Sequence, residues 1–270
     1  MMKNLVVAAH RNKGKFKLDG ILHTHLGDYE IIQIWEGCGR IVVGEMVLPM
    51  RSGALYLIDA SNLHFVMPDY YDRYERNAIR IHGELLSDMS AFLYGKELVR
   101  TGSALYIPLT PEEAIKADEL FRSITERQRR EDAESALLTL SDISCLLSFF
   151  MRAPQKPESV HTDGVTERLI FYVKENYKSR IDLSDLSREL GISKYYLCRI
   201  FKQSTGMRIF DYVHSYRLAE AKKLLATTEL SATEIAYAVG FDTYSYFSAF
   251  FKQNVGASPR EFRKQIRRSV

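Results

Sequence analysis

Two nearly identical segments lie in the last third of this 270-residue chain. The sequence FKQSTG at 201–206 recurs as FKQNVG at 251–256, and each copy follows a short helical pattern that ends in glycine, at 186–191 and at 235–240. Chance rarely reproduces residue type and spacing together, so the repeat predicts two copies of one helix–turn–helix unit. The second helix of such a unit enters the DNA major groove, so one chain is expected to contact two successive grooves.

The basic charge of the chain is concentrated in the half that carries the repeat. The net charge of the whole chain is only +3, but residues 160–270 contain 18 Lys and Arg against 12 Asp and Glu, whereas the rest contains 19 against 22. Alone, this excess is ordinary for a solvated domain. Beside the repeat, it is the electrostatic footprint expected of a DNA-binding domain.

Composition indicates a soluble globular protein of one large or two ordinary domains, with 46% hydrophobic and 26% charged residues. The three scattered cysteines, Cys38, Cys145 and Cys198, predict a reducing compartment and neither a disulfide framework nor a cysteine zinc site. No apolar run approaches the roughly 18 residues of a membrane span, and the N-terminus lacks a secretory pattern. We therefore expect a cytoplasmic protein with no membrane partner.

Residues 1–108 are predicted to form short strands. Runs rich in Val, Ile and Tyr are broken by Gly, Asp and Pro, and the clearest lie at 31–35, 40–43, 46–48, 54–58 and 77–82. Short strands with frequent turn signals predict an antiparallel barrel or sandwich.

From Pro111 the apolar period becomes helical. One helix is expected over 112–130. A second, over 135–151, is apolar on most sides, so it must pack on the barrel or on a second subunit. Two prolines within 153–159 mark a linker, which we place at 154–164. Further helices are predicted at 165–177, 182–191, 193–205, 209–226, 231–240 and 243–254, with a last one from Pro259.

Over roughly residues 165–265 the chain resembles the two-headed DNA-binding domain of AraC/XylS-family regulators. The matching residues are, in order, Gly191, the helix SKYYLCRIFK at 193–202, YRLAEA at 216–221, IA and GF within 235–241, SYF at 245–247 and GASP at 256–259. The resemblance implies helix-turn-helix motifs at about 182–205 and 231–254 that bind double-stranded promoter DNA.

The first motif has separate packing and reading faces. Leu197, Ile200 and Phe201 share a helical stripe that packs on the first helix of the motif. The resemblance implies base contacts by Tyr195, Cys198 and Arg199, with Lys194 and Lys202 nearer the phosphates. An arginine there suits a guanine edge. Three alternatives stay open: Arg199 as a solvated charge, Cys198 as a small exposed filler, and Tyr195 packed on sugars.

The second motif departs from the family pattern. Its reading positions and basic neighbours are Tyr244, Ser245, Ser248, Lys252 and Arg260. Ala249 stands at the position that matches Arg199, and alanine can touch a thymine methyl but makes no bidentate hydrogen bond. We therefore expect the first helix-turn-helix motif to contribute most of the sequence specificity. Pro259–Arg260 is expected to form a helix start that points at a phosphate.

The N-terminal half carries a string that resembles the metal motif of cupins, made of His23, His25, Glu30 and His64. These ligand types suit a divalent transition metal, although Gly20 is misplaced for that pattern. Sensor domains of the regulator family often keep such a string without an established metal, and the resemblance then implies a small-molecule pocket that requires no cofactor. Its expected lining is His23, His25, Glu30, Trp35, Tyr56, His64 and Ile79. A packed core role also explains Trp35 and Tyr56.

These observations predict an α+β multidomain protein. We expect a cupin-like sensing barrel at 1–108, a helical dimerisation segment at 109–153 and an all-α DNA-binding domain at 165–270. The predicted function is that of a homodimeric transcription regulator, an activator by family tendency and not an enzyme, which senses a small molecule such as a carbohydrate and contacts RNA polymerase. A cupin metalloprotein or enzyme with a DNA-binding tail, and an architectural DNA-binding protein with a vestigial barrel, are the alternatives.

Overall fold

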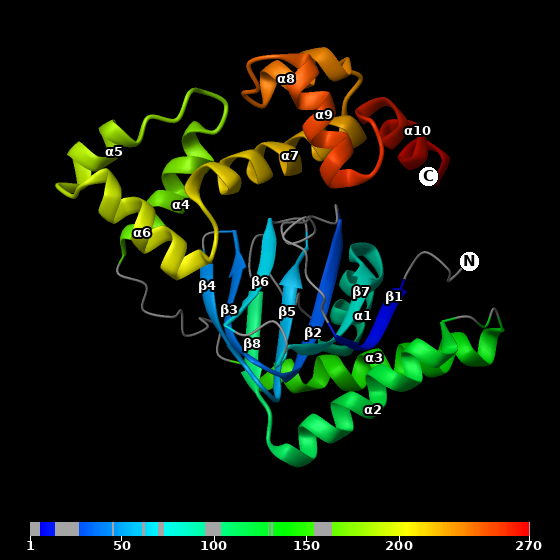
Figure 1. Ribbon diagram of the computed structural model, residues 1–270. Coiled ribbons are helices and arrows are strands. Elements are labelled where there is room, and N and C mark those ends of the chain that lie inside the picture. Colours follow the sequence, from blue (N-terminus) through cyan, green and yellow to red (C-terminus); the bar gives the residue numbers. More distant parts are fainter. Residues whose placement is uncertain are drawn as a thin grey trace. The chain divides into compact units, whose positions relative to one another are not determined.

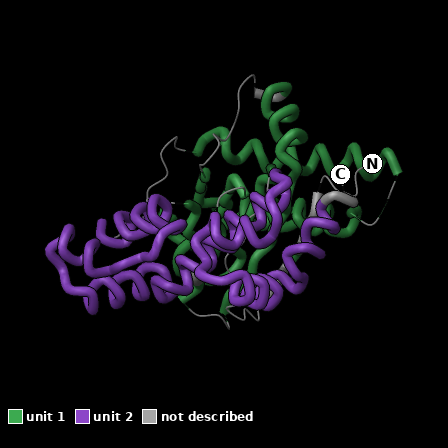
Figure 2. The backbone as a smooth tube through the Cα atoms, turned by 90° about the horizontal axis from the view of Figure 1, so that it is seen from above, with its two compact units in different colours: residues 1–16, 24–160 green, residues 17–23, 161–270 purple. Residues whose placement is uncertain are grey.

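The computed structural model describes residues 6–13, 27–44, 46–60, 63–69, 73–94, 104–128, 130, 132–153 and 164–269. The described residues up to 153 form one compact unit, here called the sandwich unit, and residues 164–269 belong to a second, the helical unit (Figure 2). All strands of the described ranges lie in the sandwich unit.

The strands form two antiparallel sheets (Figure 1). Their bounds are Val6–Lys13 (β1), Asp28–Glu36 (β2), Cys38–Val43 (β3), Met46–Arg51 (β4), Ala54–Asp59 (β5), His64–Pro68 (β6), Glu75–His82 (β7) and Ala104–Pro108 (β8). One sheet has the order β1-β7-β2-β5-β8 and the other β4-β3-β6. Among the described strands no ladder joins the two sheets. The expected barrel is therefore not closed, and the sandwich alternative describes the unit better.

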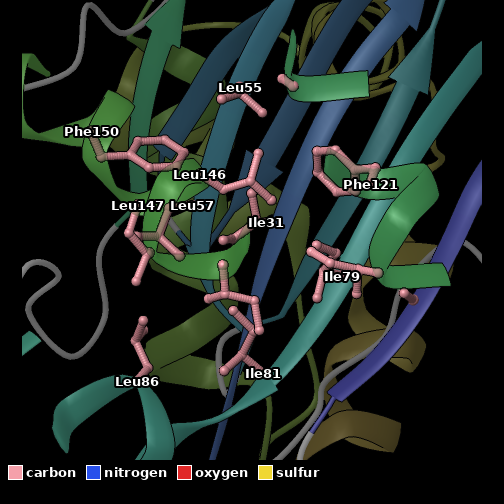
Figure 3. Packing of buried hydrophobic residues seen from close by; sticks show 14 of the residues in the cluster. Ile31, Leu55, Leu57, Ile79, Ile81, Leu86, Phe121, Leu146, Leu147 and Phe150 are labelled. Atoms are coloured by element: carbon pink, nitrogen blue, oxygen red, sulfur yellow. The ribbon is translucent and has the colours of Figure 1, made fainter. Parts of the chain in front are cut away.

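The alternation of side chains along β2 separates two hydrophobic cores. Ile32 and Ile34 belong to the cluster between the two sheets, which includes Ile41 of β3. Ile31 belongs to a second cluster on the helix-covered face of the larger sheet, where it meets Phe121 and other apolar side chains of the helices (Figure 3). The larger sheet is therefore buried on both faces.

Three helices accompany the larger sheet: α1 (Gly83–Tyr94), α2 (Pro111–Arg127) and α3 (Ala133–Phe149), which continues as the short 3-10 helix η3 (Phe150–Arg152). The start of α2 is a capping box. The Thr110 hydroxyl accepts a hydrogen bond from the Glu113 amide at 3.3 Å, and the Glu113 carboxylate accepts one from the Thr110 amide at 2.9 Å. The helix start that Pro111 predicted is confirmed.

One part of the helical segment differs from the sequence expectation. Ala133–Arg152 is long and apolar enough to cross a membrane by length and composition. However, Ile143, Leu146 and Leu147 are fully buried in the cluster on the sheet. The packing is that of a core helix that covers a sheet, while Leu137 and Leu138 remain exposed on its other side.

The helical unit contains α4 (Val165–Asn176), α5 (Leu183–Leu190), α6 (Lys194–Thr205), α7 (Ile209–Thr227), α8 (Ala232–Ala238), α9 (Tyr244–Val255) and α10 (Pro259–Ser269). We call α4–α6 the first head and α8–α10 the second head. Helix α7 runs between them (Figure 1). The predicted helices are confirmed with small shifts at their ends, and the all-α architecture with two helix-turn-helix motifs is confirmed.

Single residues set the boundaries of these helices. The side chains of Asp182, Ser193, Ser231 and Thr243 each accept a hydrogen bond from a backbone amide in the first turn of the helix that follows. Gly191 ends α5 with a φ of 67°, a left-handed conformation that glycine adopts without strain. The turns before α6 and α9 are therefore encoded locally.

Candidate nucleic-acid interface and sandwich interior

Packing leaves one side of α6 facing outward. Leu197 and Phe201 are fully buried, and Ser193 caps the helix by accepting a hydrogen bond from the Tyr196 amide at 3.2 Å. Burial of that stripe against α4 and α5 fixes the rotation of α6 about its axis. The opposite stripe is the part of the first head that a DNA groove can reach.

The predicted DNA-contacting residues of the first head all lie on the exposed side of α6. These residues are Lys194, Tyr195, Cys198, Arg199 and Lys202. Tyr195 is 78% exposed. Three cations and a phenol on one groove-sized face suit contacts to phosphates and base edges.

Tyr196 contacts Arg199, which the sequence did not lead us to expect. The guanidinium carbon of Arg199 lies 5.2 Å from the centroid of the Tyr196 ring, a cation–π geometry that holds the arginine along the helix surface. Their separation of three residues on a helix is the signal that could have identified the pair.

The second head presents a smaller and less charged face. On α9, Phe247 and Phe251 are buried, Ser245 and Lys252 are exposed, and Ser248 is partly buried. The Tyr244 ring packs against the hydrophobic cluster of this head, with its centroid 6.3 Å from that of Phe247. Of the predicted reading positions, Ser245 is therefore the most accessible. Ala249 is exposed at the position that matches Arg199.

The start of α10 carries its own carboxylate. The Ser258 hydroxyl accepts a hydrogen bond from the Glu261 amide at 3.3 Å, and the Glu261 carboxylate accepts one from the Ser258 amide at 2.7 Å. These hydrogen bonds lower the pKa of Glu261, so it stays ionised at neutral pH. A phosphate at this helix start would meet a negative charge, and the exposed Arg260 is the group there that can attract it.

The space between the two sheets holds a buried acid–imidazole pair. Glu30 lies on the same face of β2 as Ile32, and His64 lies on the same face of β6 as Val66, so both side chains point into the inter-sheet cluster. The His64 Nε2 atom lies 2.9 Å from the Glu30 carboxylate, and both residues are buried. A hydrogen bond compensates for the burial of these polar groups.

Tyrosines surround the same interior. The Tyr56 hydroxyl donates a hydrogen bond to the Pro49 carbonyl at 2.6 Å, and its ring lies 5.1 Å from that of Tyr106. Burial raises the pKa of Tyr56 far above its usual range and raises the pKa of Tyr74 to about 12. These phenols stay neutral and can donate hydrogen bonds inside the sandwich.

The structure does not bring the whole predicted pocket together. His23 and His25 lie outside the described residues. Ile79 is fully buried in the helix-covered cluster, on the opposite face of the larger sheet from Tyr56 and His64. Trp35 is partly buried near the end of β2. The residues that do share one interior are Glu30, Tyr56 and His64.

The metal prediction depends on residues that the structure does not describe. Within the described ranges no group of three or more His, Cys, Asp and Glu side chains is arranged to hold a metal ion. Glu30 and His64 supply one oxygen and one nitrogen donor and bind each other. A complete ligand set would need further donors, and His23 and His25 are the predicted ones.

Comparison with known proteins gives consistent matches. A family model described as a helix-turn-helix domain matches residues 186–265. An uncharacterized HTH-type transcriptional regulator of Escherichia coli, YdiP, is 24% identical and is matched over 91% of this chain and 81% of its own length. The HTH-type transcriptional activator RhaR of Yersinia pestis is 27% identical over 92% of this chain and 86% of its own. Among solved structures, the C-terminal domain of the response regulator yesN from Fusobacterium nucleatum is 37% identical, covering 37% of this chain and 98% of that one, with a TM-score of 0.35.

Proposed function

Because the chain belongs to the AraC/XylS family of helix-turn-helix transcriptional regulators, we propose that its two heads bind two successive major grooves of one promoter duplex and that its sandwich unit senses a small molecule. The observation that carries the proposal is the repeated exposure of α6 and α9 at matching positions. Helix α6 buries Leu197 and Phe201, α9 buries the matching Phe247 and Phe251, and each helix leaves the opposite side exposed. Two grooves on one face of a duplex are about 34 Å apart.

The two heads contribute differently to DNA binding in this proposal. On the first head we assign Arg199 a bidentate contact to guanine and Lys194 and Lys202 contacts to phosphates, because all three side chains are exposed on α6. The second head offers Ser245 and Lys252, so it contributes affinity more than base discrimination. Phosphate contacts supply much of the affinity, which therefore falls steeply with salt.

Selection from random duplexes tests this function. Purified full-length protein is mixed with a random duplex library at two salt concentrations, and the bound DNA is sequenced. A bipartite site with elements about 10 base pairs apart, the second more weakly specified, supports the proposal. Salt-sensitive binding without an enriched sequence contradicts it and favours an architectural DNA-binding protein.

The sandwich interior suits a ligand rich in hydroxyl groups. Glu30, His64 and the tyrosines carry polar atoms within an apolar shell, and a ligand with hydroxyl groups could take the place of the Glu30–His64 hydrogen bond and of the hydrogen bond from Tyr56 to the Pro49 carbonyl. We assign a carbohydrate as the ligand class. A sugar panel is screened by the rise in Tm of the full chain; Glu30→Gln should reduce the rise, and Glu36→Gln, at the exposed end of β2, should not. Absence of any rise across the panel contradicts the carbohydrate assignment.

We further propose that the protein is a homodimer that activates transcription in the cytoplasm through contact with RNA polymerase, and that it works by binding and not by catalysis. Leu137 and Leu138 leave an apolar strip on α3, with Leu137 at 69% exposure. Leu137→Glu is expected to shift sedimentation from dimer to monomer, whereas Phe92→Glu on α1 serves as the control for an exposed apolar side chain elsewhere. A dimer that survives Leu137→Glu rules out this face.

Metal retained at one ion per purified chain would instead support the metalloprotein alternative.

A further inference from the structure

Arg217 on α7 is a buried arginine bound to the backbone of the first head. Its side chain is only 8% exposed. The Nε atom donates to the Tyr177 carbonyl at 2.7 Å, and the Nη2 atom donates to the Ser179 carbonyl at 2.8 Å. These carbonyls lie just past the end of α4, where the helix dipole places partial negative charge. The guanidinium fork thus ties α7 to the first head at two points.

The second head also contacts Arg217 and the segment that follows α4. The guanidinium carbon of Arg217 lies 5.9 Å from the centroid of the Phe241 ring, which belongs to the turn between α8 and α9. The backbone of Gly240 lies against the segment after α4, because a β-carbon at this position would come within 2.5 Å of the Tyr177 carbonyl oxygen and 2.8 Å of that of Lys178. The turn between α8 and α9 in the second head therefore contacts the segment that follows α4 in the first head.

A second side chain of α7 strengthens this contact. The His214 ring stacks on Phe241 with centroids 5.9 Å apart and an interplanar angle of 14°, and it also contacts Tyr246 and Phe250 of α9. His214 and Arg217 are three residues apart, so they lie on one side of α7. Together they connect both heads to the same stretch of the helix. We call Arg217, His214, Gly240 and Phe241, with the carbonyls of 177–179, the joint.

The desolvation free energy makes a charged side chain unfavourable at such a buried contact. Burial of a guanidinium is unfavourable unless its hydrogen bonds are met, and an apolar side chain of similar volume often serves stability equally well. What a guanidinium adds is direction, because its planar donors accept only a narrow range of positions for the two carbonyls. An arginine here therefore fixes geometry better than it adds stability.

We propose that Arg217 is a positioning residue that sets the separation and angle between α6 and α9, so that the protein accepts only one spacing between the two elements of its DNA site. The proposal rests on the two-groove binding proposed above. A change of one base pair moves the second element by about 3.4 Å along the duplex and about 34° around it. A rigid joint cannot follow this change, whereas a loosened joint can.

A purely structural role for Arg217 predicts something different. If the residue only stabilised the helical unit, its loss would weaken binding to every duplex alike. If it positions the heads, its loss affects only DNA that engages both of them, because the second contact then behaves as a flexibly tethered one with a lower effective concentration. The ratio of affinities between the complete site and the first element alone separates the two roles.

The test uses the full-length chain and the bipartite site obtained by selection. The variants are Arg217→Lys, which keeps the charge and loses the fork, and Arg217→Met, which keeps the apolar stem alone. The matched control is Arg263→Lys, because Arg263 also donates to two carbonyls, those of Leu225 at 3.2 Å and Leu230 at 2.5 Å, but outside the joint. Three duplexes are compared: the native spacing, the spacing changed by one base pair, and the first element alone. Thermal unfolding is followed in parallel.

We expect wild type and Arg263→Lys to lose affinity about 10-fold or more when the spacing changes by one base pair. Both Arg217 variants should bind the native spacing about 10-fold more weakly, lose little more at the altered spacing, and bind the single element like wild type. Unchanged spacing preference in the variants overturns the inference, as does equal weakening on all three duplexes or loss of a cooperative unfolding transition. Wild type that shows no bipartite site refutes the proposed two-groove binding instead.

Discussion

Replacement of Arg199 by alanine should remove sequence discrimination at one base pair of the first element. Arg199 is exposed on α6, and its guanidinium already lies 5.2 Å from the Tyr196 ring in the free protein. An exposed cation–π contact contributes only about 0.5–1 kcal/mol, so DNA can displace it at little cost. Because the side chain is exposed, the substitution should change folding stability by no more than about 0.5 kcal/mol, so its effect on DNA binding can be measured cleanly.

The expected size follows from the contact that the exposed guanidinium can make. A bidentate arginine–guanine pair contributes about 1–3 kcal/mol of discrimination, which corresponds to about 5- to 150-fold in affinity for the preferred base. Lys202, one turn further along α6, is the comparison. Lys202→Ala should weaken binding to all sequences alike and reduce the slope of log affinity against log salt by about 0.9.

Fluorescence anisotropy with a series of duplexes measures both effects. Each duplex carries one changed base pair in the first element, and titrations are repeated at several salt concentrations. The reasoning about Arg199 is refuted if Arg199→Ala weakens all duplexes equally and lowers the salt slope, because the residue then contacts phosphate. An unchanged affinity series would show that Arg199 is a solvated charge.

Four further predictions concern other parts of the chain. Ser231→Ala removes the cap of α8 and should lower the unfolding free energy by about 1 kcal/mol, as measured by thermal unfolding of the helical unit. Phe121→Ala empties a fully buried position beneath α2 and should cost about 3–5 kcal/mol in denaturant unfolding of the sandwich unit. Burial lowers the pKa of His214 in the folded protein, so as the pH falls the unfolded chain binds the proton at a higher pH than the folded protein does. The unfolding free energy should therefore decrease as the pH drops through about 6.5, the pKa in the unfolded chain. His214→Phe should reduce this decrease, as measured by unfolding curves between about pH 7.5 and 5.5. Ala249→Arg places an arginine three residues after Tyr246, and selection from random duplexes should then show a more strongly specified second element; unchanged preferences would contradict a reading role for this position.

The helical unit was largely predictable from the sequence because its signals are local. Ser193, Ser231 and Thr243 each cap the helix that follows by accepting a hydrogen bond from the amide three residues later, and the ranges predicted for these helices begin at the same three residues. The apolar period then decides which side of each helix is buried. Exposure of the predicted residues on α6 follows from these two facts without any knowledge of tertiary structure.

The sandwich unit was less predictable because alternation fixes which residues share a face but not what that face meets. Ile79 and His64 were expected to line one pocket. In the structure Ile79 packs with the helices, and His64 pairs with Glu30 between the sheets. Barrel closure depends in the same way on pairing between distant strands, which short apolar runs do not encode.

The joint is the clearest case of information that local patterns lack. Arg217 and the Tyr177 carbonyl that it binds are 40 positions apart. An arginine on a helix is usually a solvated charge. The segment YRLAEA around Arg217 is part of the family resemblance, but it does not indicate that this side chain is buried against the carbonyls of 177 and 179. Only the packing of both heads on α7 turns it into a buried contact.

The unequal chemistry of the two heads and the rigidity of the joint are connected. In the first head, Tyr196 lies beside Arg199, to which we assign a base contact. In the second head, the matching tyrosine, Tyr246, contacts His214 and Phe241, so this side chain serves the attachment to α7. A head that is held firmly but reads few bases can still add specificity, because it rejects any site at which its phosphate contacts fall out of register. Specificity would then reside in the bases of the first element and in the distance to the second. The absence of an arginine at position 249 costs little discrimination only as long as the joint stays rigid.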